Sequence, residues 1–196
     1  HGISLHYYTR NRANYTSATD FDDALWFDYM ERTMKIEDII KNQTAIMDKY
    51  DPDKTVGLII DEWGSWYKVE PDTNPGFLYQ QNTLRDALIA GINLNIFNNH
   101  ADRVHMANIA QVVNVLQAMI LTDGEKMILT PSYHVFEMYK VHQDATLLPT
   151  NVSSRFYSHE DKHLPMINVS ASQNDSGQIN ISICNIHPSE SDEIII

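Results

Sequence analysis

The chain has little cysteine, few basic residues and no long apolar run. Its single cysteine, Cys184, excludes a disulfide within the chain and leaves the redox compartment open. Only 14 lysines and arginines stand against 26 aspartates and glutamates, which gives a formal net charge of -12 at pH 7. Nucleic acids and anionic membranes attract positive surfaces, so this balance argues against both as partners and favours neutral substrates. No apolar run approaches the roughly 18 residues of a membrane-spanning helix.

The chain does have enough apolar residues for one sizeable core. It contains 196 residues, 43 % of them hydrophobic, which is typical of a soluble globular protein. A strand-like pattern begins by Ile3, close to the first residue, and the last residues, EIII, resemble the first half of a strand. Both ends therefore predict a piece of a longer protein. Any signal peptide is then out of view, and the localisation stays open.

Helix-like and strand-like segments alternate along the first half of the chain. Residues 2–8, GISLHYY, alternate between two faces as a strand does. An apolar stripe with helical spacing follows over residues 36–47 and ends before Pro52. Residues 56–60 are all apolar or small, which is typical of a strand buried on both faces, and residues 84–94 show a second helical stripe.

The next segment, 103–122, predicts a third strand that runs into a third helix. The helical stripe consists of Val112, Val113, Leu116, Met119 and Ile120. Residues 131–142, PSYHVFEMYKVH, predict a last short helix. Repeated strand-helix units indicate an α/β fold with a parallel sheet. A doubly wound sheet would usually carry a glycine-rich phosphate turn, which is absent here, so the pattern favours a (β/α)8 TIM barrel over residues 1–146.

From about Leu147 the pattern changes to that of antiparallel strands. Ile179, Ile181 and Ile183 alternate with polar residues after the turn sequence 174–177, NDSG. We therefore expect a second, all-β domain over residues 147–196.

The end of the aliphatic strand is a candidate functional site. Asp61 and Glu62 follow the apolar run directly, and an unpaired buried carboxylate costs several kcal/mol. Such residues often only begin a loop. However, Trp63, Trp66 and Tyr67 lie within five residues of Glu62. Aromatic rings beside a carboxylate suit a sugar-binding cleft, because rings stack on the apolar faces of a sugar.

Several blocks together resemble family 51 glycoside hydrolases, the α-L-arabinofuranosidases. The resemblance covers Gly2 to His142, roughly the second half of such an enzyme, and rests on blocks that follow in the family's order: HGISLHYYT, GLIIDEWGSWY, LRDALIAGINLNIFNNHADRVHMANIAQVVNVLQAMILT and TPSYHVFEMYKVH. It implies the C-terminal part of a (β/α)8 barrel. The segment after Leu147 fits the start of the antiparallel β-sandwich that follows the barrel in this family.

The resemblance also implies a retaining mechanism, which uses two carboxyl groups about 5 Å apart. Glu62 matches the family's nucleophile at the end of the seventh strand, and its neighbour Asp61 is expected to point the opposite way and to support the site from behind. His6 and Tyr8 match the HYY block of the sixth strand, where a tyrosine holds the nucleophile. Without the resemblance, both would more readily be read as filling the barrel mouth.

Trp66 and Gln111 are the other substrate-binding residues that the resemblance implies. Trp66 matches the wall of the arabinose subsite, although a tryptophan alone is more often a core residue. Gln111 matches a glutamine that hydrogen-bonds sugar hydroxyls, although a glutamine at a helix start is usually only a cap.

The family's acid/base glutamate, with an asparagine before it, belongs to a fourth strand that this chain lacks. No Asn-Glu pair occurs in the sequence to replace it. We therefore expect the nucleophile half of a site and no activity from this piece alone. Three strands of an eight-stranded barrel leave open edges, so stability requires the missing strands or another copy of the chain, that is, a possible homo-oligomer.

No metal or cofactor is expected. His100 and His105 are five residues apart, which suits neither one helical face nor a zinc pattern. The expected partner is an arabinose-containing oligo- or polysaccharide, from which the enzyme removes terminal α-L-arabinofuranosyl groups. Two alternatives stay open: another retaining barrel glycosidase, such as a xylosidase or endoglucanase, and a non-catalytic carbohydrate-binding protein.

Overall fold

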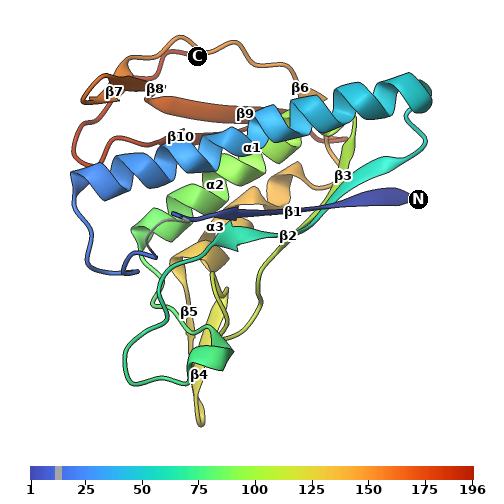
Figure 1. The fold of residues 1–196 in the computed structure, drawn as a ribbon. Coiled ribbons are helices and arrows are strands. Elements are labelled where there is room, and N and C mark those ends of the chain that lie inside the picture. The colour runs from blue at the N-terminus through green and yellow to red at the C-terminus, as the bar shows by residue number, and fades with distance from the viewer. Residues whose placement is uncertain (12–14) are drawn as a thin grey trace.

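A three-stranded parallel sheet lies at the centre of the first part of the chain (Figure 1). The computed structural model describes residues 1–11 and 15–196. The strands are β1 (Gly2–Thr9), β2 (Gly57–Ser65) and β3 (Val104–Ile109), in the order β1-β2-β3. Both neighbouring pairs are parallel, as the alternation of strands and helices predicted. The sheet is open, with β1 and β3 at its edges.

Two long helices connect these strands and cover one face of the sheet (Figure 1). Helix α1 (Asp23–Tyr50) begins where the Asp22 carboxylate accepts a hydrogen bond from the Leu25 amide at 2.9 Å. Helix α2 (Leu84–Asn99) begins with a capping box, in which the Asp86 carboxylate accepts from the Thr83 amide at 2.7 Å. Both helices confirm the segments predicted from helical spacing.

The predicted third helix is wrong. Residues 110–119 form an irregular segment, and a hairpin of β4 (Ile120–Asp123) and β5 (Lys126–Leu129) follows. Asn114 and Leu116 have left-handed backbone conformations, with φ of 59° and 52°, which an α-helix excludes. Leu116 is buried as the stripe required, but Val112 and Val113 are exposed while Gln117 is fully buried, so the burial does not follow one helical face.

The short helix α3 (Pro131–Tyr139) confirms the last helical prediction, and the 3-10 turns η1 (Pro75–Phe77) and η2 (Lys140–His142) lie in connecting segments. In Figure 1 the β4–β5 hairpin and η1 project away from the helices, on the side opposite β9 and β10. They belong to the segments that follow the carboxyl ends of β2 and β3.

The strands after residue 145 pair antiparallel, as the second half of the sequence predicted. β6 (Thr146–Leu148), β9 (Ile167–Gln173) and β10 (Ile179–Asn185) form one sheet in the order β10-β9-β6, and β7 (Phe156–His159) pairs with β8 (Lys162–Pro165). The turn between β9 and β10 is closed by Asn174, whose side-chain oxygen accepts from the Gln178 amide at 3.0 Å. The predicted hairpin is therefore confirmed.

Helix α2 joins the two sheets, since it contacts the parallel strands on one side and β9 and β10 on the other (Figure 1). Asn95 donates to the Asn168 side chain at 2.9 Å and accepts from Ser170 at 2.8 Å. Gly91 permits the close approach of β10, because a Cβ atom there would lie 2.6 Å from the Cys184 sulfur. Packing and hydrogen bonds thus fix one sheet against the other.

Candidate functional site

The carboxyl ends of β1 and β2 bring His6, Tyr8 and Glu62 together. His6 is the register partner of Glu62 across the parallel pair. The register shifts between Ser4 and His6, because β2 has one more residue than β1 over this stretch. This bulge places two successive carboxylates of β2 within reach of the same strand β1.

The expectation that Asp61 points away from Glu62 is wrong. One ring nitrogen of His6, Nε2, lies 3.3 Å from Asp61 Oδ1, and the other, Nδ1, lies 2.7 Å from Glu62 Oε2. Strict alternation would put successive side chains on opposite faces, but the bulge interrupts the pleat here. A hydrogen bond of 2.8 Å from Ser4 is the largest cause that lowers the pKa of Asp61, and His6 contributes too.

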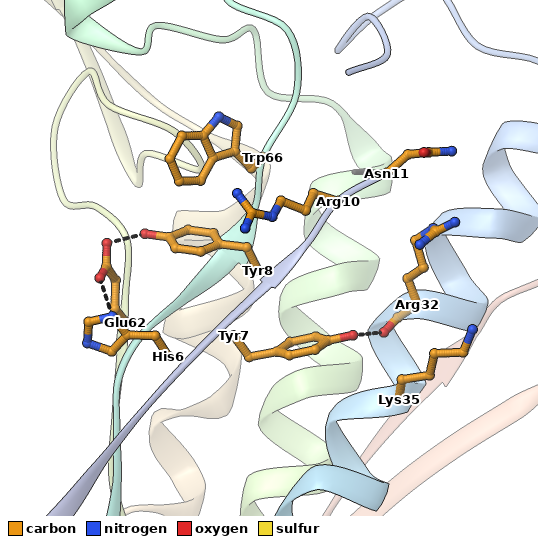
Figure 2. A pocket seen from close by; sticks show the side chains of 9 residues that line it. All are labelled: His6, Tyr7, Tyr8, Arg10, Asn11, Arg32, Lys35, Glu62 and Trp66. Carbon is orange, nitrogen blue, oxygen red and sulfur yellow. Dashed lines mark hydrogen bonds and ion pairs between the residues drawn. The ribbon is translucent and has the colours of Figure 1, made fainter. Parts of the chain in front are cut away.

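Both oxygens of the Glu62 carboxylate have a partner (Figure 2). The Tyr8 hydroxyl donates a short hydrogen bond to Oε1, and His6 contacts Oε2. The predicted contact between Tyr8 and Glu62 is therefore confirmed. The two partners fix the plane and direction of the carboxylate, and 35 % of its side chain stays exposed.

Tyr8 is held in its protonated form. Burial is the main cause that raises the pKa of its hydroxyl far above the usual range, and the bond to Glu62 raises it further. The Trp66 indole packs against Tyr8 edge to face, with ring centroids 4.9 Å apart. The Arg10 guanidinium lies 5.3 Å from the centre of the Trp66 ring. Tyr8 thus lies between an aromatic wall and the carboxylate.

These side chains line one pocket along β1 (Figure 2). Its lining residues are His6, Tyr7, Tyr8, Arg10, Asn11, Arg32, Lys35, Glu62 and Trp66. Tyr7 points the other way from Tyr8 and donates to the Arg32 carbonyl on α1 (Figure 2). Because β1 is an edge strand of the sheet, the pocket is open on that side.

Gln111 lies apart from this pocket. It follows β3 and is exposed, and it is not among the lining residues that include Trp66. Its amide donates to the Val115 carbonyl at 3.2 Å within the irregular segment, so it does not begin a helix either. The structure thus brings four of the five predicted site residues together, and the expectation that Gln111 shares a concavity with Trp66 is not met.

Sequence reasoning missed a buried polar cluster behind the end of β2. The Ser65 amide donates to the Gln117 side chain at 2.7 Å, and the Ser65 hydroxyl donates to Asp86 at 2.5 Å. Burial raises the pKa of the Asp86 carboxyl. Gln117 was assigned to the helix that does not form. One feature of the sequence could have indicated this: the polar residues Asn114 and Gln117 interrupt the apolar run VVNVLQAMI.

Among residues 1–11 and 15–196, no three His, Cys, Asp or Glu side chains are grouped in a way that could hold a metal ion. His100 instead lies 3.6 Å from Glu37, and this contact is the largest cause that lowers the pKa of Glu37 to about 2. His105 packs beside Gly57, at the start of β2. Within the same residues, no helix has the length and apolar character needed to cross a membrane.

Parallel strands that carry a carboxylate beside aromatic rings at their carboxyl ends are typical of glycoside hydrolases. Comparison with known proteins identifies the family within the glycoside hydrolases. The chain belongs to the α-L-arabinofuranosidase family, because residues 61–195 match the family model described as the α-L-arabinofuranosidase C-terminal domain.

Individual relatives support the same family assignment. The chain is 50 % identical to an intracellular exo-α-L-arabinofuranosidase of Bacteroides ovatus, over 100 % of this chain and 38 % of that protein. It is 32 % identical to intracellular exo-α-(1->5)-L-arabinofuranosidase 1 of Bacillus subtilis (strain 168), over 81 % of this chain and 32 % of that protein. The crystal structure of the GH51 arabinofuranosidase from Xanthomonas axonopodis pv. citri superposes with a TM-score of 0.94 at 52 % identity, covering 96 % of this chain and 39 % of that one. The chain thus spans less than two fifths of the length of these relatives.

Proposed function

We propose that this chain forms the carboxyl-terminal part of an α-L-arabinofuranosidase that removes terminal α-L-arabinofuranosyl groups from arabinan or arabinoxylan side chains. The observation that carries the proposal is the Glu62 carboxylate, which Tyr8 and His6 orient inside a pocket walled by Trp66. The relatives named above are arabinofuranosidases, which supports this substrate over a xyloside or a glucan.

The proposed reaction is a double displacement with retention of configuration. Glu62 attacks the anomeric carbon, the bond to the leaving group breaks, and a glycosyl-enzyme forms that water then hydrolyses. Tyr8 donates to Oε1 of Glu62, and His6 contacts Oε2. Together these two contacts fix the orientation of the carboxylate. Trp66 provides the wall of the arabinose subsite, whereas Gln111 lies outside this pocket and is not part of the proposed subsite.

The acid/base carboxyl group is proposed to come from a part of the enzyme outside this sequence. We further propose that β1, β2 and β3 are strands of a (β/α)8 barrel, with residues 1–146 in the barrel and residues 147–196 in a partial β-sandwich. Two observations support this arrangement: the exposed strand edges at β1 and β3, and the limited share of each relative that the chain covers. A second copy of the chain is an alternative cover for these edges.

The experiment is an assay of the full-length protein that contains this chain. We expect it to hydrolyse 4-nitrophenyl α-L-arabinofuranoside faster than the β-D-xyloside, and we expect residues 1–196 alone to be inactive. Preference for the xyloside would favour another retaining glycosidase. Binding of arabino-oligosaccharides without turnover would favour a carbohydrate-binding protein, and turnover by residues 1–196 alone would reveal an acid group inside this sequence.

A further inference from the structure

The backbone on either side of Trp66 is held by two buried glutamines from separate segments. Gln117, in the irregular segment after β3, accepts from the Ser65 amide at 2.7 Å through its side-chain oxygen. Gln80, in the segment before α2, accepts from the Tyr67 amide at 2.9 Å in the same way. Gln117 is fully buried and Gln80 is 1 % exposed. Neither lines the pocket that contains Trp66.

Each glutamine is itself fixed through its amide nitrogen. The Gln117 nitrogen donates to the Asp86 carbonyl at 2.7 Å and to the Ser132 hydroxyl at 2.9 Å, and so it joins the first turns of α2 and α3. The Gln80 nitrogen donates to the Ser65 hydroxyl at 3.1 Å. Both side chains therefore use their oxygen and their nitrogen, and neither can turn without breaking a buried hydrogen bond.

Gly64 gives Gln117 the space to reach this backbone. A Cβ atom on Gly64 would lie 3.3 Å from the Gln117 side-chain oxygen and 3.4 Å from the Ala110 carbonyl. The φ of Gly64 is +144°, a conformation that residues with a side chain rarely adopt. The end of β2 is thus shaped to admit a glutamine from the next segment.

Trp66 connects this restrained backbone to the pocket, because its neighbours Ser65 and Tyr67 bond the two glutamines while its own side chain lines the pocket. Its own amide donates to the Thr9 carbonyl at 3.0 Å, at the end of β1. Its ring packs edge to face against Tyr8, and Tyr8 donates to Glu62 (Figure 2). A displacement of the indole changes the space that Tyr8 occupies and therefore the direction of the Glu62 carboxylate.

We propose that Gln117 and Gln80 are positioning residues, which set the orientation of Trp66 in the pocket and, through Tyr8, that of the carboxylate of Glu62. The inference rests on the proposed glycosidase function of this pocket. It assigns a role to side chains that do not line the pocket and lie behind the end of β2. A rate that depends on orientation falls steeply with small displacements, so loss of one such restraint is expected to be visible in turnover.

The test uses the full-length protein with Gln117→Met and, separately, Gln80→Met. Methionine keeps a similar volume and removes the hydrogen bonds. Each variant is expected to lower kcat/KM for 4-nitrophenyl α-L-arabinofuranoside by about tenfold or more. The matched control is Ser170→Ala, which removes a buried hydrogen bond to Asn95 between α2 and β9. It should stay within about twofold of the wild type, since its contacts lie outside the pocket.

A double-variant cycle separates positioning from general loss of structure. If Gln117 acts through Trp66, Gln117→Met should change kcat/KM by less than about twofold in a Trp66→Ala background. An equal loss in both backgrounds would overturn the inference. Unfolding of both glutamine variants, followed by far-UV circular dichroism, would also overturn it, because the glutamines would then serve stability alone.

A second readout is independent of activity. The near-UV circular dichroism that distinguishes the wild type from Trp66→Ala reports how firmly the Trp66 indole is held. This difference signal should be strongly reduced in Gln117→Met and Gln80→Met, and should persist in Ser170→Ala. If the wild-type enzyme does not hydrolyse arabinofuranosides, the proposed function fails while this signal still tests the positioning. An unchanged signal in both glutamine variants would reject the positioning even if the enzyme is active.

Discussion

The Tyr8 hydroxyl, on β1, donates a hydrogen bond to the Glu62 carboxylate, on β2, across a separation of 54 residues in the sequence. The parallel pairing of these strands places the two side chains together at the carboxyl end of the sheet. The first prediction concerns this bond. In the full-length protein, Tyr8→Phe should lower kcat for an aryl α-L-arabinofuranoside by about 10- to 100-fold, because the carboxylate loses the donor that orients it.

Steady-state kinetics check this prediction, and KM should change little. Tyr50→Phe is a matched control, because Tyr50 lies at the end of α1 and is 84 % exposed. An unchanged kcat in Tyr8→Phe would show that the bond does not contribute to turnover.

The second prediction concerns Glu62 as the nucleophile. Glu62→Ala should lower turnover by several orders of magnitude while the fold is retained, because in the proposed mechanism this side chain forms the covalent intermediate. Azide can then enter the vacated space and displace an activated leaving group in a single step. The product should be the β-configured glycosyl azide, which nuclear magnetic resonance identifies. The α-configured azide, or near wild-type activity, would show that another residue is the nucleophile.

The third prediction concerns the close contact between the two sheets. Gly91→Ala places a Cβ atom 2.6 Å from the Cys184 sulfur, so the Cys184 side chain, helix α2 or strand β10 has to move. We expect a loss of about 1–3 kcal/mol in the free energy of unfolding, measured by chemical denaturation. The double variant Gly91→Ala/Cys184→Ala removes the sulfur and should recover part of this loss. Simple additivity of the two single variants would contradict the proposed clash.

The fourth prediction concerns stability at high pH. Burial raises the pKa of Tyr67 well above its usual value, and its hydroxyl accepts a hydrogen bond from Arg85 at 3.0 Å. In the unfolded chain a tyrosine ionises near pH 10, so above about pH 10 the folded state binds more protons than the unfolded one. Stability from Tyr67 is therefore complete below about pH 10 and falls as the pH rises further, by up to about 1.4 kcal/mol per pH unit.

Melting temperatures measured from pH 8 to 11 check this prediction. The decline should be shallower in Tyr67→Phe than in the wild type, and Tyr50→Phe should follow the wild type because Tyr50 is exposed. Identical declines in Tyr67→Phe and the wild type would contradict it.

The parts of the fold that could be predicted from the sequence are those that depend on regular spacing. The apolar run at residues 56–60 indicated a buried parallel strand, and the stripe containing Ile36 and Ile40 indicated a long helix whose buried side faces the sheet. The pairing of Tyr8 with Glu62 was predictable because the resemblance placed both at the ends of neighbouring strands.

Two features could not be predicted because they depend on tertiary contacts. The bulge in β2 turns Asp61 towards His6, and period-two alternation contains no sign of it. The segment around Gln117 has a helical stripe but does not form a helix. There the buried side chain bonds Ser65, Asp86 and Ser132, and these contacts decide the backbone path.

The open side of the pocket along β1 has a practical consequence. His6, Tyr8 and Glu62 line one wall of the pocket, and in the proposed arrangement the opposite wall comes from the segment that pairs with the edge strand β1. Under the proposed function, turnover would therefore serve as a signal of association: two separately produced pieces, each expected to be inactive alone, would release a coloured phenol from an aryl arabinofuranoside only when they associate. If the proposed function holds, residues 1–196 are a candidate for one piece of a split reporter enzyme.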